Sequence, residues 1–371
     1  LFYAPASSLV RADEPMLVND FTDEIYTVSD YVYAEEISTG TVLYSKGSES
    51  RCCPASTIKV LTALIAVENC SLDETVVFTH KAVSIPEGYT VLPGYIGEEM
   101  PLIDCLYGML VLSANDCANA IAEHVAGSIE AFAELMNAKA EELGCRNSHF
   151  VTPYGGYDPV HYSTAYDMFL ISRAAFADPL IVEMAHTHDY TISATNMSGE
   201  RYIMSKNQLY TQGSEYFNEN VDASKTGYLD TGRCSVTLAH KDDKAIIVVC
   251  MHSSDYYAVF SDTNRLLNHA FENMELLIPE TEPETTAPET ETTTEQATAP
   301  ESETTALEKT TTVTETETET EESLSAGAAD DHTENQVGAV DAKIIIIVIA
   351  GVLAAGLIAI GVIFILKNSK K

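Results

Sequence analysis

Two side chains three residues apart, Ser56 and Lys59, offer the first chemistry in this sequence. They form an S-x-x-K motif between Pro54 and an apolar run over residues 60–67, which predicts a buried helix. Positions i and i+3 share one face of a helix, so the hydroxyl and the amine should lie side by side. A serine hydroxyl needs a base to become a nucleophile, and burial can lower a lysine pKa enough for that role. The pair predicts nucleophilic catalysis; a core helix with one solvated lysine is the plainer alternative.

Two further short motifs carry hydrogen-bonding and charged side chains. Ser113 and Asn115 lie between two stretches with helical apolar spacing, which places a hydroxyl and an amide on a short turn. Lys225 and Thr226 precede Gly227 in a strand-like segment, where a glycine often marks the close approach of another backbone. We expect that backbone to be a substrate added as an extra strand, with Lys225 facing a carboxylate. A capped helix joint and a solvated lysine before a turn are the ordinary alternatives.

The surrounding pattern predicts the elements that must position these residues. A hairpin over 30–37 and 41–45 should precede the first helix, and a helical block should span 102–144. Alternating or apolar segments and helical spacing predict the rest of the globular part: a helix over 163–176, strands over 190–193, 201–204, 234–239 and 245–251, and a last helix over 257–273.

The charge of the chain is concentrated in one segment. The formal charge of the 371 residues is −36, which argues against nucleic acid as a partner. Residues 279–341 hold 18 acidic residues and one basic residue, so they contribute −17. This segment is rich in Thr, Glu and Pro and nearly free of large apolar residues, so we expect a disordered linker or stalk.

An uncharged run predicts a membrane anchor after this linker. Residues 344–366 are 23 residues without a charge, which as a helix would be about 34 Å long, enough to span a bilayer. More lysines follow the run than precede it, so residues 367–371 should be a cytoplasmic tail and the main domain extracytoplasmic. Residues 1–12 resemble the remnant of a secretory signal, which agrees with this topology.

The eight cysteines do not indicate a disulfide framework or a metal site. Cys105, Cys117 and Cys250 fall in apolar periodic segments, where cysteine acts as a small buried hydrophobe. Cys52 and Cys53 are adjacent and cannot easily pair with each other. No C-x-x-C motif occurs, so zinc is not suggested.

The order S-x-x-K, S-x-N and K-T-G, at residues 56, 113 and 225, resembles the signature of penicillin-recognising serine enzymes. Longer stretches, including the H-Y-S-T-A-Y-D sequence of residues 161–167, resemble the low-molecular-mass penicillin-binding proteins that are D-alanyl-D-alanine carboxypeptidases. The resemblance covers residues 25–278. It implies an α/β (α+β) fold of the β-lactamase and transpeptidase type: an antiparallel sheet flanked by helices, an all-helical lobe, and the site between them.

The resemblance also implies roles for the motif residues. Ser56 would be the acylated nucleophile, Lys59 its base, and Ser113 the group that passes a proton to the leaving D-alanine. The substrate-binding residues would be Asn115, Lys225, Thr226, Gly227 and Tyr228, with the backbone N–H groups of Ser56 and Tyr228 as the oxyanion hole. The implied partners are peptidoglycan stem peptides and, as covalent inhibitors, β-lactam antibiotics; no cofactor or metal is implied.

Some features depart from the family pattern, and other functions compete. Lys206 and Lys244 stand where the family often has arginines near the substrate carboxylate, and a lysine lacks the bidentate fork of arginine. A β-lactamase would be expected to show S-D-N, whereas Ala114 occupies the middle position here. A non-enzymatic penicillin receptor has little room for a signalling domain after residue 366. A D,D-transpeptidase would use the same acyl-enzyme, and the sequence does not separate it from a hydrolase.

Overall fold

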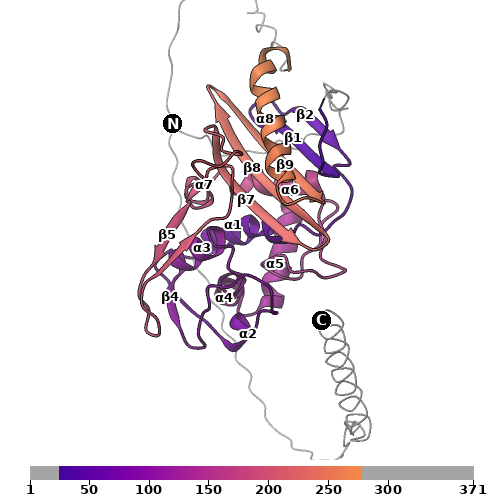
Figure 1. The fold of residues 1–371 in the computed structure, drawn as a ribbon. Helices are drawn as coiled ribbons and strands as arrows, with labels where there is room; N and C mark the ends of the chain where they lie inside the picture. The colour runs from indigo at the N-terminus through magenta and orange to yellow at the C-terminus, as the bar shows by residue number, and fades with distance from the viewer. Residues whose placement is uncertain (1–24, 278–371) are drawn as a thin grey trace, which may run out of the picture. The chain divides into compact units, whose positions relative to one another are not determined.

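The computed structural model describes residues 25–277, with the side chains of residues 274–277 left aside. A five-stranded antiparallel sheet in the order β2-β1-β9-β8-β7 forms its centre (Figure 1). The strands are β1 (Tyr31–Glu36), β2 (Thr41–Lys46), β7 (Val221–Leu229), β8 (Gly232–Lys241) and β9 (Lys244–Ser253). β1 pairs with β2, β7 with β8 and β8 with β9, each pair being joined by a tight connection. β1 also pairs with β9, although these two strands lie near opposite ends of the described chain. β7 ends the sheet on one side.

Both faces of this sheet are buried, which explains its nearly continuous apolar strands. In β9, Ile246 and Val248 pack in one hydrophobic cluster, while Ile247 and Val249 pack in another. Successive side chains of a strand point to opposite faces, so the two clusters lie on the two sides of the sheet. Helix α8 (Ala258–Leu277) covers one face, and α6 (Ala165–Ala175) packs with β1 and β9 on the other. The sheet is therefore the middle layer of a three-layer arrangement.

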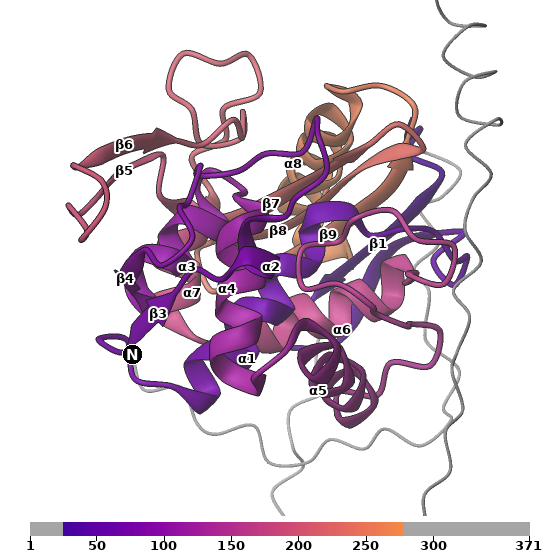
Figure 2. The same ribbon diagram turned by 90° about the horizontal axis from the view of Figure 1, so that it is seen from below.

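A second region, built mainly of helices, packs against the α6 side of the sheet (Figures 1 and 2). A short 3₁₀ turn, η1 (Ala55–Ile58), leads into α1 (Lys59–Asn69), whose first eight residues are all buried. The other helices of the region are α2 (His80–Val83), α3 (Leu102–Leu110), α4 (Asn115–Ala126), α5 (Ile129–Glu142) and α7 (Pro179–His186). α1 is thus a core helix that begins beside the sheet.

The predicted elements are confirmed, with changes at their ends. The last predicted helix begins at Ala258 and the helix over 163–176 begins at Ala165, because the Thr164 hydroxyl caps it by accepting from the Asp167 N–H. Ser128 caps α5 in the same way, as its position before an apolar helical pattern predicts.

The expectation of an all-helical lobe is wrong. Two strand pairs accompany its helices: β3 (Thr75–Val77) with β4 (Glu99–Pro101), and β5 (Asp189–Ile192) with β6 (Arg201–Met204), the latter at the periphery in Figure 2.

The eight cysteines are free thiols, and Cys105, Cys117 and Cys250 are fully buried, as their apolar surroundings predict. Among residues 25–277, no helix is both long and apolar enough to cross a bilayer. The expected signal remnant (1–12), linker (279–341), membrane-spanning run (344–366) and tail (367–371) lie outside the described residues.

Candidate active site

Ser56 lies on the 3₁₀ turn η1, not on the α-helix that the S-x-x-K spacing predicts. A 3₁₀ helix has three residues per turn, so positions i and i+3 stand even more directly above one another than on an α-helix. Lys59, the first residue of α1, therefore places its Nζ 2.8 Å from the Ser56 Oγ. Ala55, immediately before the serine, has a φ of 50°, a left-handed conformation that is uncommon for a residue with a Cβ. The turn that presents the hydroxyl is a strained one.

Lys59 has no exposed surface, and four oxygens surround its amine. Its Nζ lies 2.5 Å from the Asn115 Oδ1, 3.1 Å from the Ser113 carbonyl oxygen and 3.3 Å from the Ser113 Oγ, besides the Ser56 Oγ. The amide and carbonyl oxygens can only accept hydrogen bonds. A neutral amine has two N–H groups, which these two oxygens can take, and one lone pair, which is then left for a hydroxyl. The arrangement suits a neutral Lys59 that accepts the Ser56 proton.

Ser113 joins this pair to Lys225. It lies in the joint between α3 and α4 with a φ of 68°, a second left-handed residue at the site. Its Oγ accepts from the Lys225 Nζ at 2.9 Å, and the same amine donates to the Thr226 carbonyl oxygen at 2.9 Å. A continuous series of contacts therefore runs from Ser56 through Lys59 and Ser113 to Lys225. The structure brings the three sequence motifs together in one place.

Burial sets the electrostatics of the two lysines. Burial, and then the charge of Lys225, hold the pKa of Lys59 well below the usual lysine value. Burial alone lowers the pKa of Lys225 to about 7. The desolvated ammonium is the costly form in each case, and two ammonium groups around one hydroxyl repel each other. The site therefore favours a neutral Lys59 and leaves Lys225 able to take up a proton when an anion arrives.

The glycine of the K-T-G motif permits a close contact, but not with the partner that the sequence suggested. A Cβ on Gly227 would lie 2.8 Å from the Ala55 Cβ and 2.9 Å from the Ser56 backbone nitrogen. The backbone that approaches this face of β7 is thus that of the nucleophile turn η1. A substrate that adds itself as an extra strand would have to pair with the edge of the sheet instead. Gly155 is tighter still: its φ is 79°, and a Cβ there would lie 1.9 Å from the Ala55 carbonyl oxygen. The strained turn is held between these two glycine-containing segments.

An open cleft of about 580 Å³ surrounds the motif residues. Ser56, Ser113, Asn115 and the four residues from Lys225 to Tyr228 line it; Lys59 lies beneath the Ser56 hydroxyl. Asn115 is 97% buried and directs its oxygen at Lys59, so it also positions the lysine, beyond the substrate-binding role expected for it.

Of the two lysines expected near the substrate carboxylate, only Lys206 lines this cleft. Lys244 begins β9 at the β8–β9 turn beside Asp243, and the expectation for it is wrong. The sequence analysis missed Arg233, which lines the cleft with its Cζ 4.1 Å above the Tyr228 ring. Tyr228 and Arg233 are cross-strand partners across the tight β7–β8 turn. If the register of this hairpin had been predicted from the sequence, Arg233 would have been placed beside the K-T-G segment.

The depressed pKa of Lys225 predicts a pH-dependent contribution to stability. A free lysine has a pKa of about 10.4, so between about pH 7 and pH 10 the unfolded chain binds the proton that the folded chain lacks. Lys225 therefore makes the folded state gain stability as pH rises through this window. We expect the free energy of unfolding of the wild type, minus that of Lys225→Met, to increase by up to about 3 kcal/mol from about pH 7 to about pH 9.5.

Urea unfolding at the two pH values measures this difference. The control is Lys241→Met, which removes an exposed lysine from the same sheet and should leave the difference unchanged with pH. A constant difference for Lys225→Met would show that the Lys225 amine titrates in the folded chain as it does in water.

Comparisons with known proteins agree with this geometry. The family model for the peptidase S11 family, D-alanyl-D-alanine carboxypeptidase, matches residues 23–255. The chain is 31% identical over 246 residues to the D-alanyl-D-alanine carboxypeptidase DacF of Bacillus subtilis, covering 65% of this chain and 61% of the relative. It is 27% identical over 255 residues to DacC of Escherichia coli, covering 66% of this chain and 61% of the relative. The chain therefore spans about three-fifths of the length of these relatives.

Solved structures share the fold. The D-alanyl-D-alanine carboxypeptidase from Mycobacterium tuberculosis superposes with a TM-score of 0.61 at 26% identity, covering 67% of this chain and 92% of that structure. The Streptomyces K15 DD-transpeptidase gives a TM-score of 0.62 at 24% identity, covering 67% and 98%. The match of the family model over most of the described residues, together with the three motifs gathered around Ser56, shows that this chain belongs to the S11 family of D-alanyl-D-alanine carboxypeptidases.

Proposed function

We propose that this chain is a serine D-alanyl-D-alanine carboxypeptidase, which removes the terminal D-alanine from peptidoglycan stem pentapeptides. The observation that carries the proposal is the continuous series of hydrogen bonds from Ser56 through Lys59 and Ser113 to Lys225. It provides a nucleophile, a base, a route for a proton and a cation for a free carboxylate. The family of the chain supports the same activity.

The first chemical step is acylation of Ser56. The Ser56 Oγ attacks the carbonyl carbon of the penultimate D-alanine while its proton passes to the Lys59 Nζ. The negative charge that develops on the carbonyl oxygen is stabilised by the backbone N–H groups of Ser56 and Tyr228. The Ser113 hydroxyl, which contacts both lysines, then delivers a proton to the nitrogen of the departing D-alanine. Water attacks the ester in the second step and frees Ser56. A β-lactam would acylate the same hydroxyl and remain attached for longer.

Substrate recognition uses the edge of the sheet. Because β7 ends the sheet, an extended stem peptide can pair with it as an additional strand. The terminal carboxylate would then meet Lys225 and the Thr226 hydroxyl, where charge-assisted hydrogen bonds replace those lost from water. Lys206 and the guanidinium of Arg233 line the same cleft and supply further positive charge. Arg233 thus offers the bidentate guanidinium that a lysine in this cleft lacks.

The direct test is incubation of the protein with a pentapeptide ending in D-Ala-D-Ala, with the products separated by mass. Release of free D-alanine with the matching tetrapeptide is the expected result. Addition of an amine acceptor distinguishes hydrolysis from transfer, since a transpeptidase would yield the amide product instead. Rapid turnover of a penicillin, with no lasting adduct, would indicate a β-lactamase and contradict the proposal.

The roles of Ser56 and Lys59 predict the behaviour of two variants. Ser56→Ala should lose covalent labelling by a fluorescent penicillin and keep the fold. Lys59→Arg keeps a basic side chain, but arginine stays protonated and cannot supply a lone pair at ordinary pH, so acylation should slow by orders of magnitude. Stopped labelling reactions resolved on gels give the rates, and Lys81→Arg, on the exposed Lys81–Glu130 pair, is the matched control. Near-normal acylation by Lys59→Arg would reduce Lys59 to an electrostatic partner.

The role of Lys225 predicts a difference between two substrates. Lys225→Gln removes the cation and keeps most of the bulk, so kcat/KM for the acid substrate should fall by about 10²- to 10³-fold, a few kcal/mol. The same peptide with an amidated C-terminus carries no charge there, so the variant should affect it much less. Steady-state kinetics of both enzymes on both substrates measure this. Equal losses on the two substrates would assign Lys225 to the proton route around Ser113 instead of to the carboxylate.

The location of the enzyme is the last part of the proposal. The uncharged run of residues 344–366, with lysines after it, supports a single membrane span with the catalytic domain extracytoplasmic and the C-terminus cytoplasmic. Protease added to intact cells should release the domain, and a chain shortened to end near Pro279 should stay in the supernatant and label with penicillin. Protection of the domain in intact cells, with cleavage only after lysis, would reverse the orientation.

A further inference from the structure

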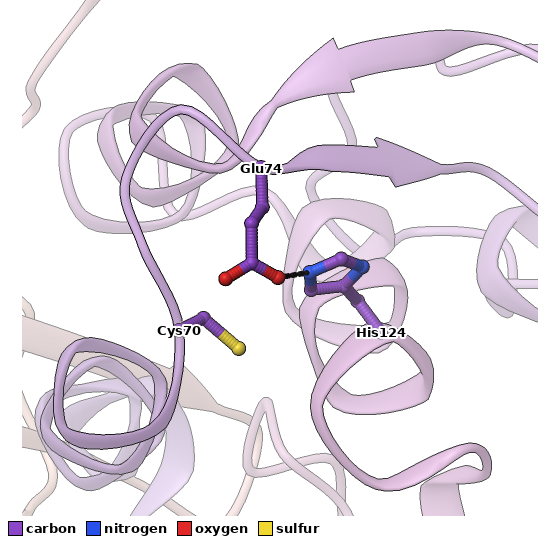
Figure 3. Close-up of side chains that lie close together, drawn as sticks. All are labelled: Cys70, Glu74 and His124. Carbon is purple, nitrogen blue, oxygen red and sulfur yellow. Dashed lines mark hydrogen bonds and ion pairs between the residues drawn. The ribbon is translucent and has the colours of Figure 1, made fainter.

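Three side chains of types that bind metal ions lie together near the C-terminal end of α1, away from Ser56. The Cys70 thiol, the Glu74 carboxylate and the His124 imidazole have ligand atoms that all lie within 4.8 Å of one another (Figure 3). The His124 Nε2 lies 2.9 Å from the Glu74 Oε2. Four histidine–carboxylate pairs occur within residues 25–277, and this pair alone has a third ligand of these types within that distance. An ion pair between Glu74 and His124 alone does not account for the Cys70 thiol beside it.

Hydrogen bonds order the turn that carries Cys70 and Glu74. Cys70 caps the C-terminal end of α1, and its N–H donates to the Ala66 carbonyl. The turn that follows is closed by the Ser71 N–H, which donates to the Glu74 Oε1 at 2.6 Å and leaves the Oε2 facing His124. The Glu74 carbonyl accepts from the Leu102 N–H at 2.8 Å, which ties the turn to the start of α3. Because the turn that carries two of the ligands is ordered before any ion arrives, only side-chain freedom is lost on binding.

The electrostatic setting favours a cation. His124 lies in the last turn of α4, and Cys70 follows the last residue of α1, so the cluster lies near two helix C-termini, which carry partial negative charge. A thiolate, an imidazole and a carboxylate form a donor set suited to zinc. Around tetrahedral zinc, such ligand atoms lie about 3.3–3.7 Å apart, given metal–ligand distances of about 2.0–2.3 Å. The observed spacings are 2.9 Å between the His124 Nε2 and the Glu74 Oε2 and at most 4.8 Å within the cluster, so the side chains, which are partly solvent-exposed, must rotate to reach this range.

We propose that Cys70, Glu74 and His124 form a zinc site, with water as the fourth ligand. The ion would join the C-terminal ends of α1 and α4. These two helices begin at the active site: Lys59 is the first residue of α1 and Asn115 the first of α4. The eleven residues of α1 separate Cys70 from Lys59 by about 16 Å, so the ion takes no part in the chemistry at Ser56. Its role is to fasten two helices whose first residues, Lys59 and Asn115, contact each other in the active site, and the proposal is independent of the proposed activity.

The test is a zinc titration of the full-length protein, freed of reductant and chelator, in competition with a chelating dye. We expect one zinc ion per chain. Cys70→Ser, Glu74→Gln and His124→Gln should each weaken binding by at least about 10- to 100-fold, the loss that even outer-shell partners of a metal cause. Cobalt in place of zinc should give a thiolate charge-transfer band in the wild type and no such band in Cys70→Ser. Zinc should also raise the unfolding temperature of the wild type and not of these variants.

Two matched controls separate this site from unspecific binding. His252→Gln removes the histidine of a carboxylate pair of 2.8 Å that has no third ligand, and Cys145→Ser removes a partly buried thiol elsewhere. Both should bind zinc as the wild type does. Absence of zinc binding by the wild type, or equal affinity in the Cys70 and Cys145 variants, would leave Glu74 and His124 as an ordinary ion pair. Penicillin labelling of the same samples reports on Ser56 separately, so a failed zinc site does not bear on the proposed function.

Discussion

The rest of the structure depends on a lysine amine that is kept out of water beside a hydroxyl. Burial makes the charged form of Lys59 costly, and the Asn115 amide oxygen and the Ser113 carbonyl oxygen accept the two N–H groups of the neutral form. Those oxygens come from the α3–α4 joint, and the hydroxyl comes from η1. The apolar cores on both sides of the sheet are needed to hold these pieces at hydrogen-bond distance. The reactivity of Ser56 therefore depends on an unfavourable burial of Lys59 that the fold as a whole must offset.

Local regularity could be predicted from the residue pattern, whereas contacts between distant segments could be predicted only where the family resemblance implied them. Apolar periodicity predicts the helices and strands within a few residues, because burial on one or two faces imposes it on the chain. The spacing of Ser56 and Lys59 predicts their contact, because it is a local one. The 3₁₀ geometry of the nucleophile turn is different: it depends on Gly155, about a hundred residues away, whose missing side chain leaves room for the Ala55 carbonyl. Arg233 was missed because its place beside Tyr228 exists only once the hairpin register is known.

Two left-handed residues, Ala55 and Ser113, stand at the two ends of the Lys59 hydrogen-bond group. Each is a residue with a Cβ in a conformation that costs of the order of 1–3 kcal/mol. Neither conformation would persist in an isolated peptide, so both are imposed by tertiary packing. Together with the two buried lysines, they show that the site is built from locally unfavourable features that the surrounding packing must offset. Substitutions that relax these positions are expected to trade activity for stability.

The position of β7 at the end of the sheet has a consequence for the protein at high concentration. An edge open enough to admit a stem peptide presents unpaired backbone groups to any extended segment, including β7 of a second copy, and such edges are routes to aggregation. Charge is a common protection against this, and here Arg233 of the neighbouring strand β8 flanks the edge strand. The same positive charge that suits an anionic chain end therefore makes self-association of two such edges unfavourable. Recognition of a chain terminus and resistance to self-association would then depend on one arginine.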